Sequence, residues 1–146
     1  MIYALGDLQR LTGATRSRLT FWTKSRLLRP SVHEADGTGT RQLFDWFDLC
    51  RCMLLVSLDE CGVKSSDMRS IVSRVADHSW AAPPPERNEE NDVFLLVESV
   101  RKGRIRRSRG ASFEEAVKKR PHVLGVNLSA LQRILWSRVQ NASRRH

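Results

Sequence analysis

The chain has 146 residues, of which 40% are hydrophobic and 28% are charged, and its formal net charge is +9. This length suits one domain or two very small ones, and the apolar fraction is enough for a compact core. The sequence has no run of 18 apolar residues and no recognisable signal peptide, so we expect no membrane span and a place in a reducing bacterial cytoplasm.

Two short helices separated by a tight turn are predicted at the start of the chain. Leucines recur at three-residue steps between Tyr3 and Thr12, which indicates one face of a helix. Gly13 can take positive φ after this helix, and Thr15 is a suitable N-cap for the next one. The order predicts a helix-turn-helix, in which the second helix enters the major groove of DNA.

The first residues of the second helix are the candidates for base contacts. They are polar, and two are cationic: Thr15, Arg16, Ser17 and Arg18. Arginine can make a bidentate contact with guanine, and a hydroxyl can donate or accept. We therefore expect Arg16, Ser17 and Arg18 to read bases; a solvated helix face is the alternative for the two arginines.

A glycine-centred hairpin is predicted next. Pro30 ends an apolar patch, and residues 31–35 and 40–44 flank the turn sequence Asp36-Gly37-Thr38-Gly39. A two-stranded hairpin directly after a helix-turn-helix is a wing. Arg41 at its root is expected to hold a backbone phosphate, a contact that positions the protein without reading sequence.

Two more helices complete this half of the chain. Asp45 is the predicted cap of the third helix, with Asp48 as its capping partner, and Gly62 ends it. Ser65 is the predicted cap of the fourth helix, whose apolar residues follow the i, i+3, i+4, i+7 spacing.

Three cysteines, Cys50, Cys52 and Cys61, lie on the predicted third helix. Cys52 and Cys61 fall where the helix calls for an apolar residue, and buried cysteine behaves as a small hydrophobe. A closed cysteine site needs three or four ligands, and nothing in the sequence supplies the fourth. We interpret the cysteines as structural and expect no metal or cofactor, with thiol sensing and metal sensing as alternatives.

Six segments of the first half of the chain follow one another in a characteristic order: Leu5-Gly6-Asp7-Leu8, Thr12-Gly13-Ala14-Thr15, Leu19-Thr20-Phe21-Trp22, Leu27-Leu28-Arg29-Pro30, Gly39-Thr40-Arg41-Gln42-Leu43-Phe44-Asp45-Trp46-Phe47-Asp48-Leu49 and Cys61-Gly62-Val63. Together they resemble the MerR-type winged-helix regulators. Thr20 and Trp22 stand where the family usually has arginine and tyrosine. The resemblance implies a homodimer on promoter DNA, with RNA polymerase as a further partner. The residues expected to hold the DNA backbone are Thr15, Thr20, Trp22, Lys24 and Arg41.

The net charge divides the chain into three parts. Residues 1–76, which the resemblance implies form a MerR-like winged-helix DNA-binding domain, carry about +3, residues 77–99 about −5 and residues 100–146 about +11. Residues 77–92 are acidic and rich in proline, which is typical of an extended linker. Residues 93–146 are expected to form a small α+β domain for dimerisation or regulation.

The expected order in the last part is β-β-α-β-α. Apolar runs predict strands at Val93–Val97 and His122–Val126, and Gly103 marks a turn between the first two strands. A capping box from Ser112 begins the first helix, which Pro121 ends, and Ser129 is the predicted cap of the last helix. About fifty residues are too few for a comfortable core. We expect this unit to pack on the first half or on a second copy of itself.

Six cations within nine residues form a basic run in this unit: Arg101, Lys102, Arg104, Arg106, Arg107 and Arg109. Like charges this close repel one another unless something neutralises them. We interpret the run as an arm with accessory phosphate contacts, which would steepen the salt dependence of binding. The alternatives are a solvated hairpin and neutralisation by the acidic linker.

We therefore expect a mainly α fold with small β elements, a winged helix-turn-helix followed by a small α+β unit. The expected function is a sequence-specific transcriptional regulator that binds double-stranded DNA of the bacterial nucleoid as a dimer on a symmetric site. No phosphate loop, metal cluster or nucleophile elbow is recognisable, so we do not expect an enzyme. The alternatives are a protein–protein interaction module on a MerR-like fold and a phage-type excisionase or architectural DNA-bending protein.

Overall fold

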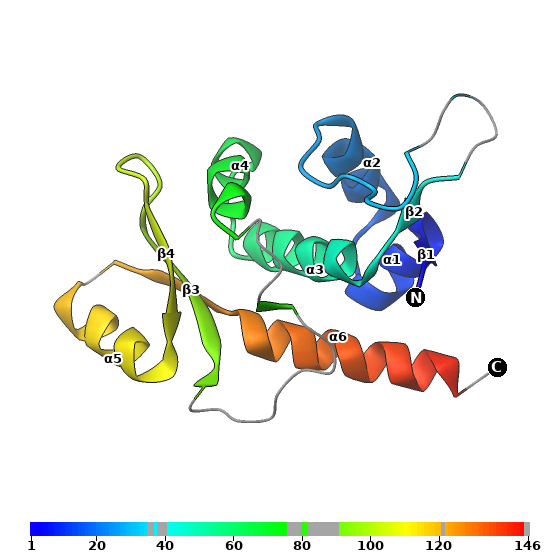
Figure 1. The fold of residues 1–146 in the computed structure, drawn as a ribbon. Coiled ribbons are helices and arrows are strands. Elements are labelled where there is room, and N and C mark those ends of the chain that lie inside the picture. The colour runs from blue at the N-terminus through cyan, green and yellow to red at the C-terminus, as the bar shows by residue number, and fades with distance from the viewer. Residues whose placement is uncertain (35–36, 38–40, 76–79, 82–90, 121, 145–146) are drawn as a thin grey trace.

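The computed structural model describes residues 1–34, 37, 41–75, 80–81, 91–120 and 122–144. These residues form six helices and two small antiparallel sheets, so the fold is mixed α/β and mainly helical. The central helix α3 (Trp46–Glu60) lies between α6 (Leu128–Ser143) below and α4 (Ser65–Ser73) above in Figure 1. Within the described part of the chain, no helix is long and apolar enough to cross a membrane.

The chain begins with β1 (Tyr3–Ala4), α1 (Leu5–Thr12) and α2 (Arg16–Lys24). The prediction of helix from Tyr3 is wrong by two residues, because Tyr3 and Ala4 pair with a later strand. The prediction for Gly13 is confirmed, since its φ of 80° ends α1. Thr15 is the predicted N-cap, and its hydroxyl accepts a hydrogen bond from the Arg18 amide at 3.3 Å.

In the described part of the predicted hairpin, three short backbone segments pair with one another. Strand β2 (Leu43–Phe44) pairs antiparallel with β1, and Leu43 also exchanges backbone hydrogen bonds with His33. The predicted turn lies largely outside the described residues, which include only Gly37 between positions 35 and 40.

Helices α3 and α4 begin differently from each other. The predicted capping box of α3 is confirmed: Asp45 Oδ1 accepts from the Asp48 amide at 2.9 Å, and Asp48 Oδ2 accepts from the Asp45 amide at 3.1 Å. The predicted cap of α4 is wrong by one residue. Lys64 is the last extended residue, so Ser65 is already helical and cannot cap from outside.

The second half follows the predicted β-β-α-β-α order, with β3 (Val93–Ser99), β4 (Arg104–Arg109), α5 (Gly110–Lys119), β5 (Leu124–Asn127) and α6. The strands form one antiparallel sheet in the order β4-β3-β5. Two predicted caps are wrong. Ser112 lies inside α5, and the cap of α6 is Asn127, whose side chain accepts from the Ala130 amide at 2.9 Å. Ser129 instead accepts from the Val93 amide.

The two faces of this sheet meet different helices. Leu95 pairs with Val126 in register, and both belong to the main core. On the opposite face Phe94 stacks on Phe113 of α5 with ring centroids 4.5 Å apart. A Cβ atom on Gly125 would lie 2.5 Å from the Phe113 ring, so the sheet requires glycine there.

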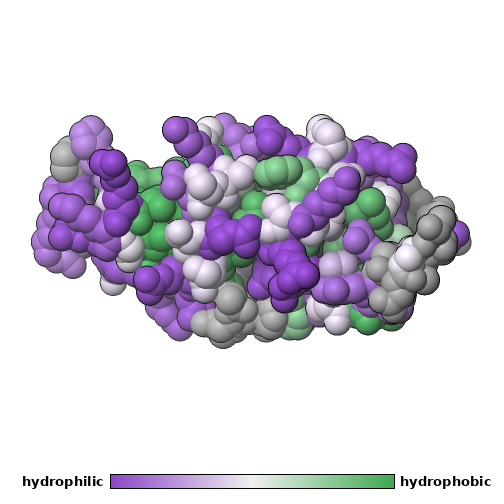
Figure 2. Space-filling view, turned by 90° about the horizontal axis from the view of Figure 1, so that it is seen from above, coloured by the Kyte–Doolittle hydropathy of each residue, from purple (hydrophilic) through white to green (hydrophobic). Residues whose placement is uncertain are grey.

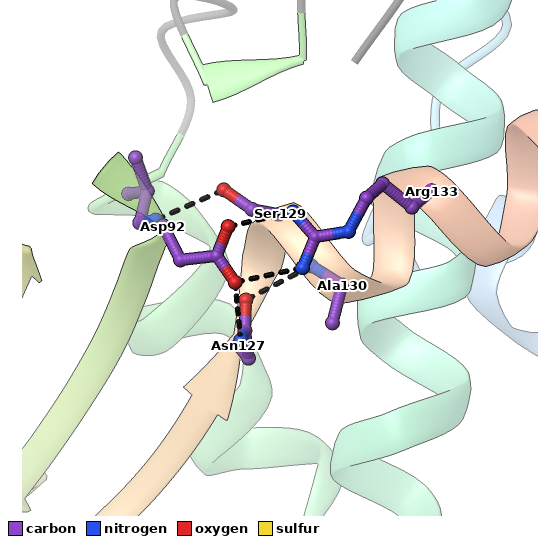
Figure 3. A network of polar contacts seen from close by, with 6 residues as sticks. Asp92, Asn127, Ser129, Ala130 and Arg133 are labelled. Atoms are coloured by element: carbon purple, nitrogen blue, oxygen red, sulfur yellow. Dashed lines mark hydrogen bonds and ion pairs between the residues drawn. The ribbon is translucent and has the colours of Figure 1, made fainter. Parts of the chain in front are cut away.

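A polar network joins the start of β3 to α6 (Figure 3). The carboxylate of Asp92 accepts two hydrogen bonds from the Arg133 guanidinium at 2.6 and 2.7 Å, and a third from Asn127 at 2.9 Å. The hydrogen bond from Arg133 is the main cause that lowers the pKa of Asp92. The linker interpretation is therefore corrected at this residue, because Asp92 is 5% exposed and fixed in the fold.

One core runs through both halves of the chain. Helix α6 packs along α3 and α1, where Trp46 and Trp136 meet edge to face at 5.4 Å. The Arg138 guanidinium donates to the Leu11 carbonyl at the end of α1, 2.8 Å away. Trp80 and Ala81, also expected in the linker, are buried, and the Ala81 carbonyl accepts from the Trp46 indole. The C-terminal unit thus packs on the first half, one of its two expected arrangements.

Candidate nucleic-acid interface

The candidate base-reading residues lie on the exposed side of α2. Leu19 and Trp22, three residues apart, point into the core with 0% and 1% of their surface exposed. Their spacing turns the start of the helix outward, so all four candidates are exposed: Thr15, Arg16, Ser17 and Arg18. The Thr15 and Ser17 hydroxyls are within hydrogen-bond distance of each other, at 3.2 Å.

The two candidate arginines differ in their surroundings. The Arg18 guanidinium forms an ion pair at 3.1 Å with Asp59, near the end of α3. Arg16 forms no ion pair with any residue that the structure describes. Arg16 is therefore free to present both of its terminal nitrogens to a base, whereas Arg18 must break its ion pair with Asp59 before it can contact a base.

The expected backbone contact of Trp22 is corrected by its burial. Its indole nitrogen is enclosed and has no hydrogen-bond partner among the described residues. A buried donor of this kind cannot reach a phosphate unless the helix moves. Thr20 is half-buried, and Lys24 is exposed at the last turn of α2.

Helix α4 holds the far end of α2. The Arg69 guanidinium donates to the Ser25 carbonyl at 2.5 Å, directly after α2 ends. The positive charge of Arg69 also suits the negative end of the helix dipole. Asp59 and Arg69 both shape the candidate site, and neither was predicted, because contacts between distant helices leave no local pattern in a sequence.

Arg41 is exposed two residues before β2, as expected of a residue at the root of a hairpin. The position of its guanidinium relative to a wing is not defined, since residues 38–40 lie outside the described part of the chain. His33, whose backbone pairs with Leu43, is exposed as well.

The basic run forms the turn and second strand of a β-hairpin. Gly103 takes φ of 62° in the turn that precedes β4, as predicted. Arg106 pairs with Glu98 at 3.8 Å, and Arg109 donates to Asn91. Most of the acidic residues that were expected to neutralise the run lie outside the described residues, and Asp92 is paired with Arg133.

Several elements of the candidate interface rise on one side of α3. Figure 1 shows α2, α4 and the β3–β4 turn on the side opposite α6. Figure 2 looks at this side, where hydrophilic residues predominate around smaller apolar areas. We call it the α2 face. It presents a long polar surface built from both halves of the chain.

Two of the three cysteines are buried in the core and do not reach this face. Cys50 and Cys52 are 1% and 0% exposed, and burial raises the pKa of the Cys52 thiol to about 12. The prediction of a buried position is wrong for Cys61, which is exposed because it follows the last turn of α3. Within the described residues, no three potential ligands gather into a metal site.

The structure also contains a pocket of about 250 Å³ away from α2, between the N-terminus, α1 and the end of α6. It is smaller than most cavities that hold small-molecule ligands. The α2 face therefore remains the candidate site.

Comparison with protein-family models finds no match to this chain, and a search of curated proteins finds no match either.

Proposed function

We propose that the protein is a sequence-specific DNA-binding transcriptional regulator of the MerR-like winged helix-turn-helix type, with α2 as its recognition helix. The observation that carries this proposal is the exposed polar start of α2, set on a rigid base. Leu19 and Trp22 anchor the helix in the core, and Arg69 holds its end. The net charge of +9 favours a polyanionic partner.

In this proposal α2 enters the major groove with its first turn against the bases. Arg16 would donate two hydrogen bonds to a guanine, and Ser17 would add a hydroxyl contact. Lys24 and Arg41 would hold backbone phosphates on either side. Arg18 would contact the DNA after its ion pair with Asp59 breaks. A homodimer would place two such helices on a symmetric site, in the way the family resemblance implies.

The experiment that tests this function is selection of bound sequences from a random pool of DNA duplexes at low and at moderate salt. We expect an enriched inverted repeat at both salt concentrations. Binding without enrichment would show an architectural role instead. Failure to retain any DNA would refute the proposal and favour a protein partner.

The enriched site then allows the roles of two arginines to be separated. Arg16→Ala should cost about 1–3 kcal/mol of binding free energy and relax the preference at one base pair. Arg41→Ala should weaken binding to all sequences alike, because a phosphate contact carries no sequence information. An unchanged order of preferred sites in Arg16→Ala would contradict the base-reading role.

A further inference from the structure

The turn of the β3–β4 hairpin, residues 100–103, stands on the α2 face although it belongs to the other half of the chain (Figure 1). We propose that this turn is a second DNA-binding element, which holds backbone phosphates of the duplex that α2 enters. The inference rests on the proposed function and extends the contact surface beyond the MerR-like half. Its partner is duplex DNA of any sequence.

The turn is connected to α2 through α4. A Cβ atom on Gly103 would lie 3.6 Å from a terminal nitrogen of Arg74, the residue that ends α4. The same helix contacts the end of α2 through Arg69 and Ser25. The hairpin turn, α4 and the end of α2 are therefore neighbours in a row, and one straight duplex can lie along them.

Three cations lie in the turn or directly after it and have no acidic partner among the described residues. Arg101, Lys102 and Arg104 are exposed and form no ion pair with any residue that the structure describes. Glu98, an acidic residue on the same hairpin, is engaged by Arg106 at 3.8 Å and by Arg120 at 3.2 Å. Arg74 adds a further positive charge beside these cations. Binding to a row of phosphates would lower their mutual repulsion and release counterions from the DNA, and both effects favour binding.

The hairpin turn is held by hydrogen bonds and by buried residues below it, so it would need little further ordering when it binds DNA. Lys102 donates its amide to the Ser99 hydroxyl, and the Gly103 amide donates to the Val100 carbonyl. Below the turn Val97 pairs with Ile105, and both side chains are buried. A binding element that is already in place gives up less conformational entropy when the DNA arrives.

Protection of a sheet edge does not account for the whole charge pattern. Strand β4 lies at an edge, and cations on such strands discourage pairing with other chains. Arg101 and Lys102, however, lie in the turn, where no strand edge needs protection, and Arg74 is the C-cap of a helix. Phosphate binding explains all of these positions together.

The test compares two variants of equal charge. The hairpin variant is Arg101→Gln, Lys102→Gln and Arg104→Gln; the control variant is Lys118→Gln, Lys119→Gln and Arg144→Gln, on α5 and the end of α6. Binding to the selected duplex and to an unrelated duplex of the same length is measured between about 50 and 200 mM salt, the range over which phosphate binding changes steeply. Thermal unfolding of each variant checks that the fold is retained.

We expect the hairpin variant to bind both duplexes more weakly by a similar factor. For each phosphate that the variant no longer neutralises, the slope of log affinity against log salt should become less steep by about 0.9. The loss of affinity between the lowest and the highest salt concentration should then be roughly 3-fold smaller than in the wild type. Equal behaviour of the two variants would overturn the hairpin proposal alone, provided that the wild type prefers its selected site. Absence of DNA binding by the wild type would overturn the proposed function and this inference with it.

Discussion

The Asp92–Arg133 pair joins the sheet to α6, so its removal should destabilise the whole fold. Asp92 is almost fully enclosed, with 6% of its side chain exposed, while 27% of Arg133 is exposed. Removing one partner of a buried pair costs about 3–5 kcal/mol, and the partial exposure of Arg133 places Arg133→Met near 3 kcal/mol. In a chain of this size that cost lowers the melting temperature by roughly 6–12 °C.

Urea unfolding of wild type and Arg133→Met provides the assay, with Arg144→Met as a control at the exposed C-cap position of the same helix. The control should change the free energy of unfolding by less than about 0.5 kcal/mol. A value for Arg133→Met as small as that of the control would refute the reasoning, because it would show that the carboxylate is not dependent on its partner.

The pH dependence of the same pair has a defined sign. The pKa of Asp92 is lowered from its ordinary value of 3.8, so its ionised form is favoured in the folded protein. Its contribution is complete above the pKa of the unfolded chain and is lost as the pH falls through the lower folded value. The difference between wild type and Arg133→Met should therefore be the same at about pH 7 and about pH 5 and should shrink below about pH 4. A difference that does not shrink below about pH 4 would contradict the assignment.

Three further predictions concern the site and the core. Asp59→Asn should release Arg18 and strengthen DNA binding by up to about 5-fold in a titration, because an exposed ion pair is worth about 0.2–1 kcal/mol; weaker binding would show that the pair positions Arg18 instead. Gly125→Ala should cost about 1–3 kcal/mol in urea unfolding, since the added methyl meets the Phe113 ring. Of the three thiols, Cys61 alone should react rapidly with an aromatic disulfide, and two fast thiols would contradict the burial pattern.

Local signals in the sequence were sufficient to predict most elements of the fold. The apolar stripes predicted α3 and α4, and a continuous apolar run predicted β3. The caps at Thr15 and Asp45 were correct because each side chain sits one residue before the first helical turn. The caps assigned to Ser65, Ser112 and Ser129 failed because a serine near the start of a helix resembles a cap whether it lies outside or inside the first turn.

The candidate site was predictable only in part, for a related reason. The polar start of α2 is a contiguous stretch of sequence, so its exposure followed from the helix period. The Arg18–Asp59 pair joins residues from two helices, and no periodicity predicts which arginine meets an acid. Trp22 stands where the family that the chain resembles usually has tyrosine, which suggested a contact with the DNA backbone, but its spacing from Leu19 gives it the position of a core residue.

The contacts of α6 determine how the two halves of the chain act together. Arg133 ties α6 to the start of β3, and Arg138 ties it to the end of α1, shortly before α2 begins in the chain. The hairpin turn and α2 thus stand over different parts of one continuous core, both on the side opposite α6 (Figure 1). A substitution that loosens α6 should therefore alter the spacing of these elements as well as stability. If both elements contact one duplex, DNA affinity will depend on residues of α6 that never touch the DNA.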